Sequence, residues 1–249
     1  MIRGIYTAAS GMLAESLRTD TIANNLANVN TAGYKKDVAV SQDFRSMYIE
    51  RINDGPETPI IGNIGVGALI EEIATIHTAG PMLHSGNHFD LAISGEGYFT
   101  VATPNGVRYT RNGSFTRNAQ GILVTQEGYP VMGQNGGTIR VDGQKVVISG
   151  DGQVAVDGIN VGALQVAAFD NENQLVKEGA TLYIAPDGVQ ARAAGGLVSQ
   201  GYLEQSNVNT VSEMVNMIAG YRAYEANSKA VQAQDQLLDK AVNEVGRVS

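Results

Sequence analysis

Apolar and small residues recur at helical spacing near the start of the chain. No proline interrupts residues 2–29, and the steps between such residues are three or four throughout. The positions are Ile2, Ile5, Ala9, Met12, Ser16, Thr19, Ala23, Leu26 and Val29. This spacing predicts a helix with a narrow apolar stripe. Asn30 and Gly33 follow it, and both residue types tolerate the left-handed conformation that ends helices.

A second pattern of the same kind runs from residue 210 to about residue 246, again without proline. Its positions are Met214, Ile218, Tyr221, Tyr224, Ser228, Val231, Asp235, Leu238, Val242 and Val245. Thr210 and Glu213 have the spacing of a capping box, which predicts the helix start. At about 1.5 Å per residue this helix would be roughly 55 Å long, well beyond the usual three or four turns.

The middle of the chain has the pattern of short strands separated by tight turns. Asn-Gly or Asp-Gly pairs, which favour hairpin turns, begin at positions 54, 105, 112, 135, 142, 151, 157 and 187. Runs rich in β-branched and aromatic residues lie between them: 89–94, 98–103, 107–111, 122–125, 138–141, 145–149, 154–156 and 162–169. This predicts an antiparallel all-β domain. Residues 34–67, interrupted by prolines and glycines, are expected to form an irregular extended connector.

These patterns predict an α+β fold with long N- and C-terminal helices pairing as a coiled-coil-like stalk and a central antiparallel all-β domain. The expected boundaries are an N-terminal helix at 1–30, a connector at 31–75, the β-rich domain at 76–204 and a C-terminal helix at 205–249. The helix faces outside the two stripes also carry apolar or small residues: Ala8, Ala14, Leu17, Ile22, Ala27, Val215, Met217, Ala219 and Ala230. Apolar residues on more than one face imply neighbours on more than one side, which points to self-association or assembly with related chains.

Composition excludes several classes of function. The net charge of −8 disfavours binding to nucleic acid or to anionic lipid. The chain of 249 residues contains no cysteine, which excludes disulfides, thiolate metal sites and cysteine nucleophiles. No run approaches the roughly 18 apolar residues of a membrane-spanning helix. Residues 1–13 lack the apolar core of a secretory signal peptide, so we expect neither cleavage nor membrane insertion.

Candidate chemistry is sparse. His84, His88 and Asp90 have metal-ligand spacing, but they flank a Gly-Asn turn before a predicted strand, which favours surface turn residues. The glycine-rich run at 62–67 lacks the Lys-Ser/Thr of a phosphate-binding loop. Glu71 and Glu72 would point to opposite faces of a strand. We therefore expect no catalytic residue, no metal and no cofactor.

Three separated blocks resemble signatures of flagellar rod and hook proteins. The first is 8–12 with 23–35, Ala-Asn-Asn-Leu-Ala-Asn-Val-Asn-Thr-Ala-Gly-Tyr-Lys. The second comprises 90–99 and 109–115, and the third comprises 201–209, 214–218 and 222–227. The chain thus resembles the flagellar basal-body rod protein family over nearly its whole length. Residues 129–133 and 239–246 favour the proximal rod member next to the distal rod, with the distal rod member as the close second.

The resemblance implies a structural rod subunit that assembles head to tail into a helical tube and transmits torque from motor to hook. The implied partners are copies of itself, other rod proteins and the flagellar type III export apparatus, and the implied location is the periplasm-spanning rod. Two other readings stay open: a distal rod or hook-type axial protein, and a peptidoglycan-acting enzyme, although the chain is short for an added hydrolase domain. A monomeric binding module is a third. The residues expected at the assembly interface are Ile5, Met12, Asn24, Asn25, Leu26, Asn28, Val29, Asn207, Val208, Asn209, Met214, Ile218, Tyr221, Val231, Leu238 and Val242.

Overall fold

The computed structural model describes residues 2–43, 46–50, 60–65 and 67–243, with backbone alone at 2–3, 46–50 and 60–64. The chain divides into two compact units. The first comprises Met1–Leu26, Asp37–Ala74 and Thr210–Ser249, and the second comprises Ala27–Lys36 and Thr75–Asn209. The α+β class with a mostly antiparallel β-rich body is confirmed.

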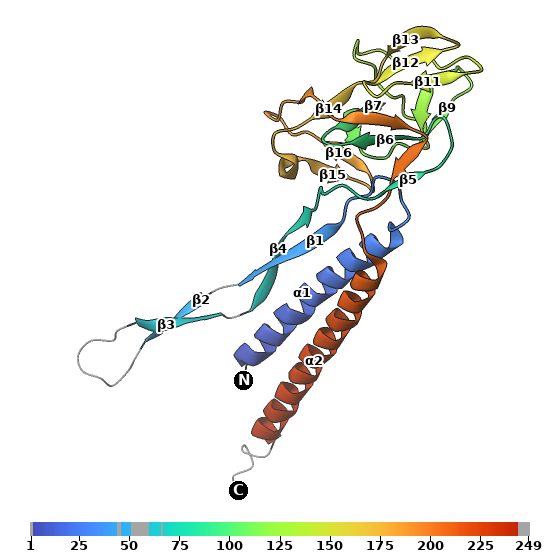
Figure 1. The fold of residues 1–249 in the computed structure, drawn as a ribbon. Coiled ribbons are helices and arrows are strands. Elements are labelled where there is room, and N and C mark those ends of the chain that lie inside the picture. Colours follow the sequence, from blue (N-terminus) through green and yellow to red (C-terminus); the bar gives the residue numbers. More distant parts are fainter. Residues whose placement is uncertain (1, 44–45, 51–59, 66, 244–249) are drawn as a thin grey trace. The chain divides into compact units, whose positions relative to one another are not determined.

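The first unit contains both predicted helices (Figure 1). Helix α1 spans Ile2–Ala27, so Val29 of the predicted stripe lies in the turn that follows. Helix α2 spans Thr210–Asn243 and begins at Thr210 itself, one residue earlier than a cap at Thr210 implies. Val245 lies outside the described residues. The existence of both helices is therefore confirmed, with small shifts at their ends.

The two helices lie side by side and run antiparallel (Figure 1). A Cβ placed on Gly4 would lie 3.3 Å from the Gln234 side chain, and one on Gly11 would lie 2.8 Å from Asn227. Further along, a Cβ on Gly220 would lie 3.0 Å from Thr19 Oγ1. Glycine therefore permits the close approach at three levels of the pair. Residue numbers rise along one helix as they fall along the other.

The predicted rotation of α1 about its own axis was wrong. Three positions of the predicted stripe, Ala9, Ser16 and Ala23, are exposed. The buried positions, Ala8, Ala14 and Ile22, belong to the set assigned to the outer faces. Small and polar residues fill the buried side of this helix, so ranking positions by hydrophobicity selected the wrong phase.

The segment expected to be an irregular connector is instead built from strands. It contains β1 (Asp37–Asp43), β2 (Ser46–Glu50), β3 (Ile60–Gly65) and β4 (Ala68–Thr75). β1 pairs with β4, and β2 pairs antiparallel with β3. The glycines and prolines of this segment favour turns locally, and for that reason they predict an irregular connector. The strands are instead stabilised by pairing with other strands that are distant in the sequence. The turn expected at Asp54 lies outside the described residues.

The second unit is built around a six-stranded sheet of order β15-β16-β8-β7-β14-β17, whose pairings are antiparallel. Its strands are β7 (Tyr98–Thr103), β8 (Gly106–Thr110), β14 (Val166–Ala168), β15 (Val176–Glu178), β16 (Leu182–Ile184) and β17 (Arg192–Ala193). A three-stranded sheet contains β11 (Val146–Ile148), β12 (Gln153–Val156) and β13 (Ile159–Ala163). Two-stranded pairs join β5 (Met82–His84) to β19 (Tyr202–Glu204), β6 (Leu91–Ser94) to β18 (Leu197–Gln200) and β9 (Phe115–Arg117) to β10 (Leu123–Thr125). A short 3-10 helix, η1, spans Glu172–Gln174.

Turn chemistry predicted part of this topology well. Asp157 and Gly158 have φ angles of 50° and 85°, and they join β12 to β13 between the paired residues Val156 and Ile159. Positive φ at both central residues is the requirement of a type I′ hairpin turn. The run at 138–141 forms isolated bridges rather than a strand, and the run at 162–169 is divided between β13 and β14.

The core of the second unit lies among these strands. Its larger cluster includes Leu91, Phe99, Phe115, Leu123 and Leu164, each at most 1% exposed. A smaller cluster gathers around Tyr98 and Tyr183, whose rings meet edge to face with centroids 5.6 Å apart. The β-rich body therefore has a conventional apolar core.

Candidate assembly interface

The seam between α1 and α2 is lined by small and polar residues. Besides the three glycines, it includes Glu15 and Thr19 of α1 and Asn227 and Gln234 of α2. In α2 the described residues that are buried are Glu213 and Gly220. The apolar seam that defines a coiled coil is therefore not confirmed.

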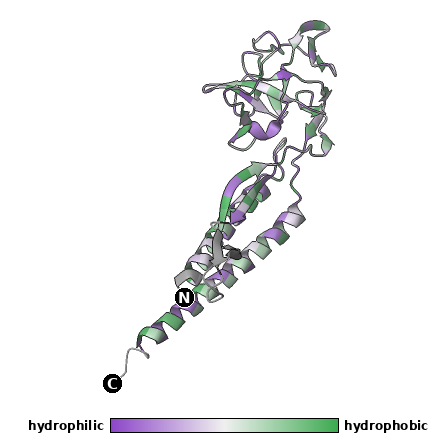
Figure 2. Ribbon diagram, turned by 90° about the vertical axis from the view of Figure 1, so that its left-hand side faces the viewer, coloured by the Kyte–Doolittle hydropathy of each residue, from purple (hydrophilic) through white to green (hydrophobic). Residues whose placement is uncertain are grey.

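Several large apolar side chains of the helices lie on the sides away from the seam, whereas Ile22 of α1 is buried. On α1, Tyr6, Leu13 and Leu17 are 69%, 60% and 41% exposed. Each follows a seam residue by two positions, which at about 100° per residue places it on the far side of the helix. Figure 2 shows hydrophobic residues alternating with hydrophilic ones along both helices.

Helix α2 repeats this arrangement. Its exposed apolar residues near the start of the helix are Val211, Met214, Val215, Ile218 and Tyr221, each 48–72% exposed. Val211, Val215 and Ile218 lie across the helix from Glu213 and Gly220, whereas Met214 and Tyr221 lie about 100° from these buried residues. Further along, the same side carries Arg222, Glu225 and Lys229, of which the last two form an exposed ion pair of 2.7 Å. The apolar patch therefore covers the first three turns of α2.

A polar contact fixes the end of the helix pair that lies near residue 25. Asn25 is fully buried, and its Nδ2 donates to the carbonyl oxygen of Asp37 at 2.7 Å. Its Oδ1 accepts from the Asp37 N–H at 2.9 Å, and its Nδ2 also lies 3.4 Å from Glu213 Oε2. One amide thus joins α1, β1 and α2 within the first unit.

The second unit contains a buried ionic cluster. Lys35 Nζ donates to Glu204 Oε1 at 2.6 Å and to the Thr78 carbonyl at 2.8 Å. Glu204 also accepts from the Gly80 N–H at 2.9 Å and from Arg111 Nη1 at 3.4 Å. The side chains of Lys35, Arg111 and Glu204 are at most 4% exposed. We call Lys35, Gly80, Arg111 and Glu204 the clasp.

Burial governs the electrostatics of the clasp. Desolvation lowers the pKa of Lys35, while the neighbouring Glu204 carboxylate opposes that shift. Two nearby cations and one anion share the space, so each charge depends on the others for compensation. The cluster is a structural element, because its three charged side chains point at one another rather than into a pocket.

Backbone contacts surround the clasp. The Gly33 N–H donates to the Glu204 carbonyl at 2.8 Å, and the φ of Gly33 is +67°. A Cβ on Gly33 would lie 2.3 Å from the Arg111 carbonyl carbon. Asn207 Oδ1 accepts from the Lys36 N–H at 2.8 Å, while its Nδ2 donates to the Ile76 and Thr78 carbonyls. The segments near residues 33, 78 and 206 are thereby held together.

The structure divides the predicted interface residues into three groups. Residues whose side chains are used within this chain are Asn25, Asn207 and Val208. Half-buried residues along the helices and the following turn are Ile5, Met12, Leu26, Asn28, Val29, Val231 and Leu238. Exposed residues are Asn24, Asn209, Met214, Ile218, Tyr221 and Val242. Their role in assembly stays a prediction.

Sequence reasoning assigned no role to Lys35, Arg111 or Glu204. All three lie inside the motifs that carried the family resemblance, so the motifs did contain the signal. Lys35 directly follows Tyr34, and Glu204 directly follows Leu203. A charged residue next to an apolar or aromatic residue of this kind could have indicated a buried charge.

The candidate chemical residues are engaged in ordinary contacts. His84 Nδ1 lies 2.9 Å from the Gly201 carbonyl, and its ring stacks on Tyr202 at 4.9 Å. Asp90 is buried and accepts from Asn87 Nδ2 at 3.1 Å. Within the described ranges, no group of three histidine or carboxylate residues is placed to hold a metal ion. Glu71 and Glu72 are both exposed on β4.

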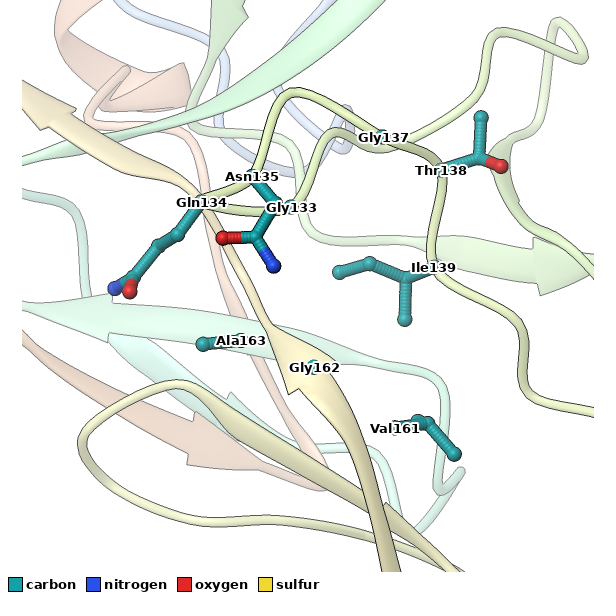
Figure 3. Close-up of a pocket in the computed structure, with 9 residues that line it drawn as sticks. All are labelled: Gly133, Gln134, Asn135, Gly137, Thr138, Ile139, Val161, Gly162 and Ala163. Carbon is teal, nitrogen blue, oxygen red and sulfur yellow. The ribbon is translucent and has the colours of Figure 1, made fainter.

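A shallow pocket of about 60 Å³ lies where the 133–139 loop meets β13 (Figure 3). Its lining is Gly133, Gln134, Asn135, Gly137, Thr138, Ile139, Val161, Gly162 and Ala163. Small-molecule sites usually enclose roughly 300–1,000 Å³. This pocket is far smaller, and no titratable side chain lines its wall.

Neither helix in the part of the chain that the structure describes has both the length and the apolar character to span a membrane.

Comparison with protein families places three matches along the chain. The model described as "Flagella basal body rod protein" matches residues 5–35. "Flagellar hook protein FlgE/F/G D1 domain" matches residues 92–156, and "Flagellar basal body rod FlgEFG protein C-terminal" matches residues 199–244. Each matched region contributes one charged residue of the clasp: Lys35, Arg111 and Glu204 in turn.

Relatives align over almost the entire chain. The flagellar basal-body rod protein FlgG of Bacillus subtilis is 36% identical, covering 98% of this chain and 99% of its own. FlgG of Caulobacter vibrioides is 38% identical over 95% and 97%, and FlgF of the same organism is 33% identical over the full length of both chains. The resemblance seen in the sequence is thus confirmed: the chain belongs to the flagellar basal-body rod protein family, and it is a structural subunit of the basal-body rod that assembles with other flagellar components rather than an enzyme.

Proposed function

We propose that this rod subunit assembles with copies of itself, head to tail, into an open helical tube that transmits torque from the motor to the hook. The observation that carries the proposal is the distribution of side chains on the helix pair. Polar and small residues line the seam inside one subunit, whereas tyrosine, leucine, isoleucine and valine face outwards. Exposed apolar surface on two opposite sides favours a neighbour on each side.

The β1–β4 ladder supports a further lateral contact. Val40 of β1 and Leu69 and Ile73 of β4 are 37–56% exposed. On the side of α1, Ser10 Oγ accepts from the Ala68 N–H at 3.3 Å. A two-stranded ribbon is marginal by itself, so apolar residues on its outer face favour contact with an adjacent subunit. Such a crossing connector would resist shear between subunits under torque.

Placement follows from the family resemblance. We propose that the assembled chain lies in the periplasm-spanning part of the rod and reaches it through the flagellar type III export apparatus. The relatives carry both FlgG and FlgF names, so position along the rod, proximal or distal, stays a prediction. Labelling the chain in purified basal bodies would test this: the label should lie within the rod, and a label in the hook or the filament would contradict the placement.

A substitution tests the assembly surface directly. Ile218→Asp should prevent assembly of the purified chain, because it would place a charge within an apolar contact. Ala230→Asp is the matched control, since Ala230 is exposed on α2 but lies to the side of the apolar patch. Sedimentation should show assembly for the control and not for Ile218→Asp. Equal assembly of both variants would refute the role of this face.

A further inference from the structure

Two exposed apolar stripes on the helix pair share a four-residue step, and a further seven-residue step on α2 reaches Arg222 just beyond its stripe. The α1 stripe is Tyr6, Leu13 and Leu17. The α2 stripe is Val211, Met214, Val215, Ile218 and Tyr221. Read from Leu17 backwards, the steps on α1 are four and seven residues. Read from Val211 forwards, the steps to Val215 and Arg222 are also four and seven, so antiparallel helices could place these positions opposite one another.

Within one chain the two stripes lie at different levels. Gly4 meets Gln234 and Gly11 meets Asn227, so residues at one level have numbers that add to 238. Leu17 is therefore level with Tyr221, and the rest of the α1 stripe lies level with the polar later turns of α2. The centres of the two stripes are offset by about ten residues, which at 1.5 Å per residue is about 16 Å.

We propose that the α1 stripe of one copy packs antiparallel against the α2 stripe of a second copy that is shifted by about 16 Å along the helix axis. The shift brings Leu17 opposite Val211, Leu13 opposite Val215, and Tyr6 opposite Arg222. The first two pairs are apolar, and the third places a guanidinium beside an aromatic ring, a favourable contact. Without the shift, Leu13 would face the exposed Glu225–Lys229 ion pair.

The size of the stripes identifies the occupant as a further copy in a chain of copies rather than a single dimer partner. Each stripe is about 16 Å long on a helix about 10 Å wide, so one contact covers only a few hundred Å². A stable two-chain interface usually buries about 1,200–2,000 Å². Because the stripes face opposite ways, each internal copy can use both, and stability accumulates along the assembly.

The stagger also has a geometric consequence. Different surfaces meet at this contact, so it is a head-to-tail contact, and each added copy is displaced along the axis. Repeating that displacement yields a screw rather than a flat ring. This inference rests on the proposed self-assembly and adds the register by which neighbouring helix pairs meet.

The absence of cysteine from the sequence allows a clean cross-linking test. Two full-length single variants, Leu17→Cys and Val211→Cys, are distinguished by a mass tag, mixed, assembled and oxidised. The comparison mixture contains Leu17→Cys and Tyr221→Cys, the pair that would meet without the shift. A disulfide requires Cα atoms within about 7 Å, so a ten-residue difference in level separates the two outcomes. Leu13→Cys with Val215→Cys provides a second pair in the proposed register.

We expect the mixed-mass product from Leu17→Cys with Val211→Cys and from Leu13→Cys with Val215→Cys, and loss of that product to background for the Tyr221→Cys mixture. Product in the Tyr221→Cys mixture instead, or assembly without any mixed product, would overturn the register while leaving the proposed self-assembly standing. If the unmodified chain does not assemble with itself, the proposed function fails and the register fails with it.

Discussion

Replacing Glu204 by glutamine removes the negative charge of the clasp while keeping the size of the side chain. Lys35 and Arg111 then remain buried with no compensating anion at 2.6 Å and 3.4 Å. Removing one partner of a buried ion pair costs about 3–5 kcal/mol. We therefore expect the second unit of Glu204→Gln to lose about 3–5 kcal/mol of unfolding free energy, a large share of the stability of an ordinary domain.

A second variant separates charge compensation from simple loss of contacts. Lys35→Met removes a cation whose burial is itself unfavourable, and Glu204 keeps the Gly80 N–H and Arg111. We expect this variant to lose about 1–3 kcal/mol, less than Glu204→Gln. The double variant should lose less than the sum of the two, because no lysine remains to be left uncompensated.

The assay is urea unfolding of the full chain, followed by the near-ultraviolet circular dichroism of the buried tyrosines. With a slope of about 1–3 kcal/mol per molar urea, the midpoint for Glu204→Gln should fall by about 1–5 M. Glu96→Gln, which breaks the exposed ion pair with Arg192, is the control and should shift the midpoint far less. A loss below about 1 kcal/mol for Glu204→Gln, or strict additivity in the double variant, would refute the reasoning.

Three further outcomes are expected. Gly33→Ala should destabilise the second unit more than Gly179→Ala, because both glycines have φ of +67° but only Gly33 would bring its Cβ against backbone; equal urea midpoints would contradict this. Hydrogen exchange should be much faster across α2 than across β7 in unassembled chain, since α2 has little fully buried surface, and comparable protection would be the opposing result. Burial, assisted by Glu172, raises the pKa of Tyr98, so its phenol stays neutral in the fold while the unfolded chain ionises near pH 10; stability should fall above about pH 10, and less steeply in Tyr98→Phe, with parallel pH profiles as the contrary finding.

Local patterns predicted the elements whose stability is local. The steps of three and four predicted both helices, and Asp157-Gly158 predicted a turn that the structure shows with the required positive φ angles. The rotation of α1 could not be predicted in the same way. Its exposed leucines and its buried alanines reverse the ordinary relation between hydrophobicity and burial in a single chain.

Long-range contacts account for the rest. The strands of residues 37–75 depend on pairing between β1 and β4, which no local signal specifies. The clasp joins Lys35 to Glu204 across 169 positions of sequence, and no local pattern pairs these two residues. Lys35 and Glu204 lie within the motifs that resemble the family, but their ion pair could be identified only from the folded structure.

The clasp also has a consequence for incomplete chains. Lys35 and Arg111 are synthesised long before Glu204, and until Glu204 is present both buried cations lack the carboxylate that lies 2.6 Å from Lys35 and 3.4 Å from Arg111. A chain that ends before residue 204 would have to leave those cations in water, and the N–H groups of Gly33, Lys36 and Gly80 would lack their acceptors in residues 204–207. Folding of the β-rich unit therefore depends on both the N-terminal signature, which contains Lys35, and the C-terminal signature, which contains Glu204. Truncated chains that lack residue 204 would leave this unit open.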